Sequence, residues 1–137
     1  MRKNILLTSV AVVGLAAVAL AAPAGAQYYK GKTINMLIPV PGGSGLDLLA
    51  RNFASHWAKQ IPGSPKIVAR NMPGGGGVKP NNFLYEKARP DGLTITYGPW
   101  NAAGIIGGNP GIRFKPEEFE YVGASHMPQT TIMRTDV

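Results

Sequence analysis

The chain has 137 residues, with 14 Lys and Arg against 7 Asp and Glu and no Cys. This length allows one small domain, and the lack of Cys excludes disulfides, thiolate nucleophiles and zinc sites with Cys ligands. The basic residues are scattered and not interleaved with aromatic residues, which argues against nucleic-acid binding and favours a mild attraction for small anions.

The first 26 residues have the layout of a secretory signal peptide. Arg2 and Lys3 form a short basic head, an apolar run extends from residue 5 to residue 22, and small residues lead up to Ala26. We therefore expect cleavage after Ala26 and export of the remaining 111 residues. A transmembrane anchor is the alternative, but the run is short for a membrane span and is rich in Ala and Gly.

The next part of the chain predicts a strand followed by a helix. The mostly apolar stretch KTINMLIPV (32–40) is typical of a buried strand. Apolar residues then recur at three- and four-residue spacing from Leu46 to Ile61, which predicts an amphipathic helix of about four turns. Pro62-Gly63-Ser64-Pro65 would end this helix.

Alternating strands and helices continue along the chain. We expect a second strand at 66–71, a helix from Pro80 to Lys87 or Ala88, and a third strand at 93–98. This order predicts an α/β fold with a βαβαβ parallel sheet. The weaker pattern beyond it predicts, in order, a turn at 107–111, a helical turn at 116–119, and strands at 121–124 and 130–133.

Glycine-rich segments follow the predicted strands. Binding sites of parallel sheets lie beyond the carboxyl ends of the strands, where residues 41–45, 72–78 and 99–104 would meet. The candidate ligand-binding residues are Gly43, Ser44, Gly45, Asp47, Gly75, Gly76, Trp100, Asn101 and His126. Trp100 either narrows the pocket or covers the loops as a lid, and a lone His such as His126 is more often structural.

Known phosphate-binding and catalytic motifs each fail at a required residue. Leu48 occupies the third glycine position of a dinucleotide fingerprint, and Val78-Lys79-Pro80 breaks a P-loop. Leu46 takes the last glycine position of a nucleophile elbow around Ser44. The sequence contains no metal-binding cluster, so we expect no cofactor, no metal and no catalytic residue. An exported α/β hydrolase that uses Ser44 remains an alternative, although neither His56 nor His126 is a convincing base for it.

The spacing Ser44-x-x-Asp47 fits a helix-capping box. Ser44 would then cap the helix and Asp47 would lie in its first turn, while free N–H groups from Gly43 to Leu46 and the helix dipole would attract an anion. Asp47 would repel a highly charged ligand, and it suits a carboxylate that also offers a hydroxyl, amine or water. Capping and ligand binding are compatible roles.

Three motifs in register resemble the solute receptors of tripartite tricarboxylate transporters, the Bug or TctC-type family. They are IPVPGGSGLDLLAR, with Asp47, Ala50 and Arg51; ARNMPGGGGV, with Asn71 and Pro73; and ARPDGLTITYG, with 90–92 and Thr94. The segment FKPEEFEYVGASHMP is similar to the part of the family that leads from the first lobe into the second. The resemblance covers nearly all of residues 32–137.

The resemblance implies a periplasmic, monomeric, non-enzymatic receptor with two lobes in a type II periplasmic-binding-protein arrangement. The glycine loops would hold a small organic carboxylate, and membrane transporter subunits would be the partners. The chain would divide into a signal peptide (1–26), the N-terminal part of the first lobe (27–124) and a crossover toward a mostly absent second lobe (125–137). Because family members are longer, we expect an incomplete first lobe and a truncated form of a receptor. A nonbinding periplasmic interaction protein is a further alternative.

Overall fold

The computed structural model describes residues 28–99 and 101–123, which contain one three-stranded sheet. Its strands are β1 (Thr33–Ile38), β2 (Lys66–Asn71) and β3 (Thr94–Thr96). They lie in the order β2-β1-β3, and both neighbouring pairs are parallel. The predicted α/β class and the parallel sheet are thus confirmed.

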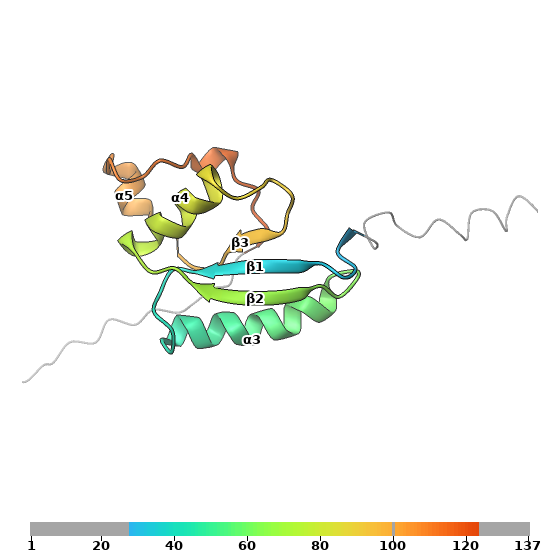
Figure 1. The fold of residues 1–137 in the computed structure, drawn as a ribbon. Coiled ribbons are helices and arrows are strands. Elements are labelled where there is room, and N and C mark those ends of the chain that lie inside the picture. Colours follow the sequence, from blue (N-terminus) through green and yellow to red (C-terminus); the bar gives the residue numbers. More distant parts are fainter. Residues whose placement is uncertain (1–27, 100, 124–137) are drawn as a thin grey trace, which may run out of the picture.

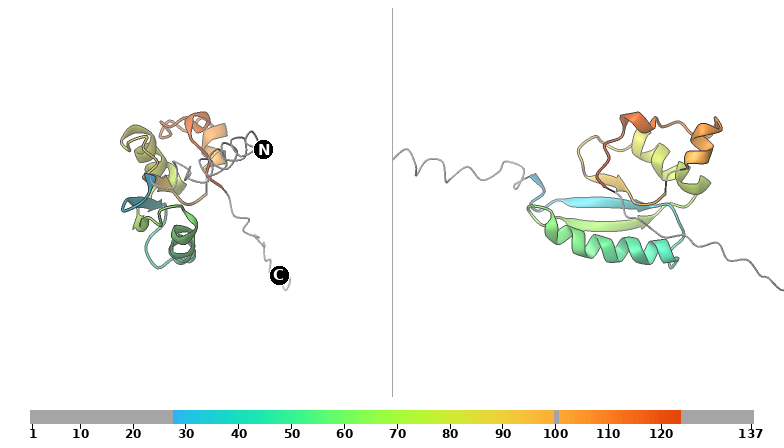
Figure 2. Two further views of the ribbon diagram at one scale, coloured as in Figure 1. Left: turned by 90° about the vertical axis from the view of Figure 1, so that its right-hand side faces the viewer. Right: turned by 180° about the vertical axis from the view of Figure 1, so that it is seen from behind.

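Helices cover both faces of this sheet. Helix α3 (Gly45–Gln60) lies along one face, and α4 (Val78–Glu86) and the short α5 (Ala102–Ile106) lie on the other (Figures 1 and 2). Two 3₁₀ turns complete the structure, η1 (Gly75–Gly77) and η2 (Pro116–Glu118). Within the described ranges, none of the helices has the length and apolar character needed to cross a membrane.

The core lies between β1 and α3. Met36 and Ile38 of the central strand are fully buried and pack with Ala50 and Ala54 of the helix. Two alanines at four-residue spacing place small side chains on the buried stripe of α3, so the helix can approach the strand closely. Leu37 points to the opposite face and is also buried. Burial on both faces explains why β1 is almost continuously apolar.

The predicted elements are largely confirmed, with shifts at their ends. The bounds of β2 are those expected, whereas β1 and β3 are shorter than the predicted strands. Helix α4 begins at Val78, two residues before the expected start at Pro80. Pro80 occupies its third position, where the missing N–H needs no intrahelical acceptor. Gly77 precedes the helix in the left-handed region, with φ of 98°.

Beyond β3, the described residues include one helix that was not predicted, and one predicted strand is wrong. Residues 102–106 form α5, which the pattern did not indicate, because five residues are too few for a helical period to be recognised. Residues 121–123 have no regular structure, so the described part of the expected strand at 121–124 is not a strand. The strand expected at 130–133, the crossover expected at 125–137 and the signal peptide expected at 1–26 lie outside the described residues.

Candidate ligand site at the carboxyl ends of the strands

The loops after the three strands converge, as the parallel topology requires. The first and third loops touch, since a Cβ on Gly98 would lie 2.4 Å from Cγ of Pro39. The second and third loops are joined by a hydrogen bond, in which Nδ2 of Asn101 donates to the carbonyl oxygen of Gly75 at 3.1 Å. The described parts of the three loops therefore lie close together beyond the carboxyl ends of the strands.

Ser44 caps helix α3, as the spacing predicted. Its backbone is extended, with φ of −72° and ψ of 161°, and its Oγ accepts a hydrogen bond from the N–H of Asp47 at 3.4 Å. Within the described part of the chain, no acceptor contacts the N–H groups of Ser44, Gly45 and Leu46. These three donors lie at the positive end of the dipole of a 16-residue helix.

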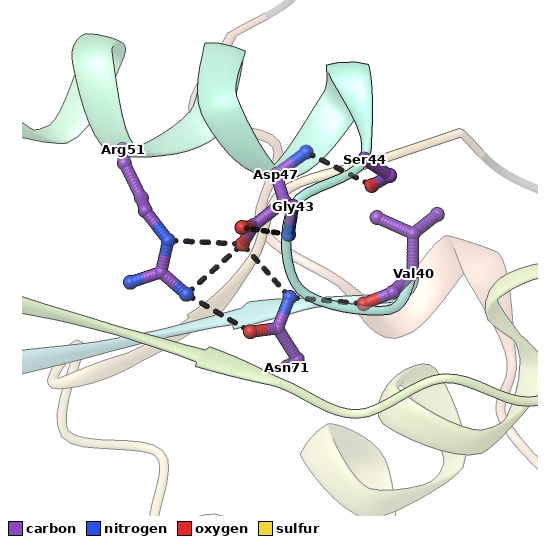
Figure 3. Close-up of polar contacts among 6 residues, drawn as sticks. All are labelled: Val40, Gly43, Ser44, Asp47, Arg51 and Asn71. Atoms are coloured by element: carbon purple, nitrogen blue, oxygen red, sulfur yellow. Dashed lines mark hydrogen bonds and ion pairs between the residues drawn. The ribbon is translucent and has the colours of Figure 1, made fainter.

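Asp47 is the centre of a polar network that joins α3, the first loop and β2 (Figure 3). Its Oδ2 accepts from the backbone N–H of Gly43 at 2.9 Å. Its Oδ1 accepts hydrogen bonds from Nε of Arg51 at 3.0 Å and from Nδ2 of Asn71 at 2.8 Å, and it forms an ion pair with Nη2 of Arg51 at 3.0 Å. The Asp47 residue is only 3% exposed.

Asn71 closes this network on the strand side. Its Nδ2 also donates to the carbonyl oxygen of Val40 at 2.9 Å, and its Oδ1 accepts from Nη2 of Arg51 at 2.9 Å. The pairing of Ile38 with Asn71 in the sheet register brings the end of β2 beside the first loop. One amide side chain thus fixes the position of that loop relative to β2 and α3.

The network keeps Asp47 ionised. Hydrogen bonds from Arg51, from the N–H of Gly43 and from Asn71 lower the pKa of Asp47 from its ordinary value of 3.8 to about 2. The charge of Arg51 adds to this effect, while burial opposes it. Because Arg51 pairs with the carboxylate, the first loop does not present an uncompensated negative charge to an anion.

Two details of the expected site change. The prediction that the N–H of Gly43 is free is wrong, because this group donates to Asp47. The carboxylate of Asp47 is surrounded by donors from the protein, so its geometry favours positioning the loop over accepting from a ligand. Arg51 and Asn71 were absent from the predicted site. The four-residue spacing of Asp47 and Arg51 on a helix is the local signal that indicates Arg51. Asn71 lies 24 residues from Asp47, and no local spacing indicates this contact.

The second loop requires glycine at every position from 74 to 77. These four residues have φ values of 148°, 60°, 60° and 98°, all in the region that side chains disfavour. A Cβ on Gly77 would also lie 3.0 Å from the carbonyl oxygen of Pro99. The predicted site residues Gly75 and Gly76 therefore belong to a loop whose backbone approaches the third loop closely.

Asn101 has a defined place in the third loop, where it caps α5 by accepting from the N–H of Gly104 at 2.9 Å. Trp100 and His126 lie outside the described residues. His56 is exposed on α3, and its hydrogen bonds within the described residues are to Ser55 and the carbonyl oxygen of Asn52, as expected for a surface residue.

The geometry gives no support to the hydrolase alternative. The one hydrogen bond of the Ser44 hydroxyl within the described residues is to the N–H of Asp47, and no histidine contacts it there. His56 lies 12 residues further along the same helix, about 18 Å away along its axis. Across residues 28–99 and 101–123, no three His, Cys, Asp or Glu side chains gather to form a metal site.

Comparison with known proteins agrees with the motif resemblance. The chain is 32% identical over 99 residues to protein BugT of Bordetella pertussis (strain Tohama I). Over these residues the chain is a Bug-family sequence. The alignment covers 71% of this chain and 29% of BugT, so the chain spans less than a third of that relative. No family model matches the chain, and no solved structure matches it significantly.

The Bug-family motifs acquire a structural meaning from the network. Asp47 and Arg51 come from the first motif and Asn71 from the second, and these three side chains bind one another. The four glycines of the second motif are the residues with positive φ. The motif residues therefore build the shape of the first two loops. In the first loop, the N–H groups of Ser44, Gly45 and Leu46 have no acceptor among the described residues.

Proposed function

We propose that this chain forms part of a periplasmic solute receptor of the Bug family. In this proposal it binds a small organic carboxylate and delivers it to the membrane subunits of a tripartite tricarboxylate-type transporter. The observation that carries the proposal is the set of three N–H groups at the start of α3 that have no acceptor among the described residues, in a chain that matches BugT over 99 residues. The protein binds its ligand without chemical turnover.

A carboxylate fits the first loop better than a phosphate group or the oxyanion of a reaction intermediate does. The N–H groups of Ser44, Gly45 and Leu46 can donate to two carboxylate oxygens, and the helix dipole favours one negative charge there. The Asp47–Arg51 pair is almost neutral as a unit, so it adds no strong attraction for a highly charged group. We therefore assign the direct ligand contacts to backbone groups and give Asp47 a positioning role.

The second and third loops supply the remaining walls in this proposal. Gly75, Gly76 and Asn101 lie at the junction of those loops, and Trp100 and His126 complete the proposed set of ligand-contacting residues. The lack of side chains at 74–77 lets a ligand approach the backbone of the second loop closely.

We further propose that the sheet is the first lobe of a type II binding-protein fold, with a hinge to a second lobe. The outer edge of β3 has no neighbouring strand among the described residues. Next to it, the rings of Phe53 and Tyr97 pack at 5.2 Å, and Phe53 and Leu49 of α3 remain exposed. An exposed strand edge beside an apolar surface is where further structure would pack.

The carboxylate contact is best tested by removing one N–H group. Gly45 is the first residue of α3, where proline is well tolerated, and Ser44 before it already has the extended backbone that a proline requires. A Cβ at Gly45 would meet no atom within 4 Å. Gly45→Pro therefore deletes one free donor with little expected change to the fold, and Gly45→Ala keeps the donor and serves as the matched control.

The experiment is a calorimetric titration of the full-length receptor with a panel of mono-, di- and tricarboxylates. Thermal stability measured with and without each compound selects the ligand, which at 100 times its Kd should add about 2.7 kcal/mol. We expect Gly45→Pro to weaken affinity about 10-fold or more, as for one lost charge-assisted hydrogen bond, and Gly45→Ala to leave it unchanged. Equal affinity of the two variants would exclude this N–H group from the site.

Periplasmic export rests on the signal peptide. Mass spectrometry of the protein from a periplasmic extract should show a mature chain that begins at Gln27. A protein that keeps residues 1–26 and sediments with the membrane would contradict export with cleavage.

A further inference from the structure

A groove runs along the exposed side of α4, away from the free N–H groups of α3. Its volume is about 500 Å³, and its lining is formed by the second loop, α4 and Arg113. The groove shares Gly75 with the proposed carboxylate site, but none of Ser44, Gly45 and Leu46, which supply the proposed N–H contacts, lines it.

The floor of the groove is apolar. Phe83 is 39% exposed at its centre, and Met72 and Val78 extend the apolar surface toward the second loop. Phe83 on α4 and the half-buried Met72 of the second loop line one groove, and such an apolar lining is a surface that a partner side chain can cover.

The ends of the groove are positively charged. Lys79 and Lys87 are eight residues apart, which corresponds to about 12 Å along the helix axis. Neither forms an ion pair with another described residue. The third cation, Arg113, is already occupied, because its Nε and Nη2 donate to Glu86 at 2.6 and 3.1 Å. The hydrogen bonds from Arg113 also lower the pKa of Glu86, so Glu86 stays ionised and paired with Arg113.

The spacing of these groups matches an extended polypeptide. In an extended segment, side chains i, i+2 and i+4 point to one side and span about 13 Å. An acidic, an apolar and a second acidic residue at those positions would place carboxylates at Lys79 and Lys87 and the apolar side chain on Phe83. A small ligand is usually enclosed on most of its surface, whereas this groove lies open along a helix.

We propose that the α4 groove is a docking site for an extended acidic segment of a partner protein, with the pattern acidic-x-apolar-x-acidic. The groove and such a segment match in charge and in length, and this match does not depend on which carboxylate occupies the site at the strand ends. The partner is defined here by this chemistry alone.

The test uses the full-length protein and a capped, fluorescein-labelled peptide that contains Glu-Ser-Leu-Ser-Glu. Fluorescence anisotropy should give a Kd below 1 mM that weakens as salt is added. Replacing both Glu by Ser, or Leu by Ser, in the peptide should weaken binding at least 5-fold. In the protein, Lys79→Ala, Lys87→Ala and Phe83→Ala should each do the same.

Lys59→Ala is the matched control, because Lys59 is an exposed lysine on α3 at the other face of the sheet. It should bind the peptide like the unaltered protein. No binding below 1 mM, or full binding by the Lys79→Ala and Lys87→Ala variants, would overturn the proposal. An affinity for free suberate, an eight-carbon dicarboxylate, equal to that for the peptide would also overturn the proposal, because the groove would then be a small-molecule site. Gly45→Pro should not affect peptide binding, so failure here is distinguishable from failure of the carboxylate proposal.

Discussion

Asn71 gives the sharpest test of how the first loop is held in place. In Asn71→Ala, Nδ2 no longer donates to the carbonyl oxygen of Val40 at 2.9 Å or to Oδ1 of Asp47 at 2.8 Å. A neutral hydrogen bond contributes about 1 kcal/mol and one to a charged group about 2 kcal/mol. The bond from Arg51 is exposed, and we expect little from it. Asn71→Ala should therefore lower the free energy of unfolding by about 3 kcal/mol.

Asn71→Asp keeps the shape of the side chain and replaces the Nδ2 donor by an oxygen acceptor. It places a carboxylate oxygen where Nδ2 now stands, close to the carboxylate of Asp47 and to the carbonyl oxygen of Val40. Two carboxylates at this distance cannot both be ionised without a large penalty, so the pKa of the new group should be raised in the folded state. Asn71→Asp should be less stable than Asn71→Ala at pH 7, and this deficit should shrink as the pH falls toward the ordinary range of an aspartate.

The assay is urea denaturation followed by circular dichroism, repeated between pH 7 and pH 4.5 for the unaltered protein and both variants. Comparing the two variants with each other removes the changes with pH that they share. A loss below about 0.5 kcal/mol for Asn71→Ala would refute the network as a determinant of stability. A pH-independent difference between the variants would refute the proximity of the two carboxyl groups.

Three further predictions follow from the loops. Because the pKa of Asp47 is about 2 in the folded chain and ordinarily 3.8, its contribution should be present above about pH 4 and be lost as the pH falls toward 2. An acid titration of Asp47→Asn should lack this part of the transition, and an unchanged titration would contradict it. Gly98→Ala should cost about 1–3 kcal/mol in urea denaturation because its Cβ would overlap the ring of Pro39, whereas Gly45→Ala should be neutral or stabilising by up to about 1 kcal/mol. Equal stabilities of these two variants would contradict the close approach. Ser44→Ala should cost about 1 kcal/mol in thermal denaturation through loss of the cap, and no loss would show that the bond to the N–H of Asp47 is unimportant.

Patterns of residues near one another in sequence predicted most of the fold. The apolar stripe of α3 repeats every three or four residues over 16 residues, so its helical period is evident without knowledge of the fold. The length and β-branched content of β2 and β3, and the turns between elements, indicated a βαβαβ order in the same way. Helix α5 was missed because five residues are too few to show a helical period. Its start is fixed by the Asn101 cap.

The candidate site was predicted in outline, with errors in the roles of its residues. Ser44 and Asp47 are three residues apart, and the cap they form is a local structure that spacing alone indicates. Asn71, which binds Asp47 from the end of β2, is 24 residues away in sequence, so no local pattern could reveal this contact. The same limit applies to the contact between Gly98 and Pro39 and to the bond between Asn101 and Gly75.

By itself, the sequence determined the class of the fold, the convergence of three loops and the Bug-family membership of the matched residues. These follow from short-range periodicity, from turn residues and from motifs that can be compared directly. Only the tertiary structure decided that the carboxylate of Asp47 is enclosed by Gly43, Arg51 and Asn71 rather than presented to a ligand. The physical reason is the sheet register, because pairing Ile38 with Asn71 brings the end of β2 against the start of α3. A buried carboxylate needs hydrogen bonds, and Asp47 accepts them from the donors that the fold places beside it.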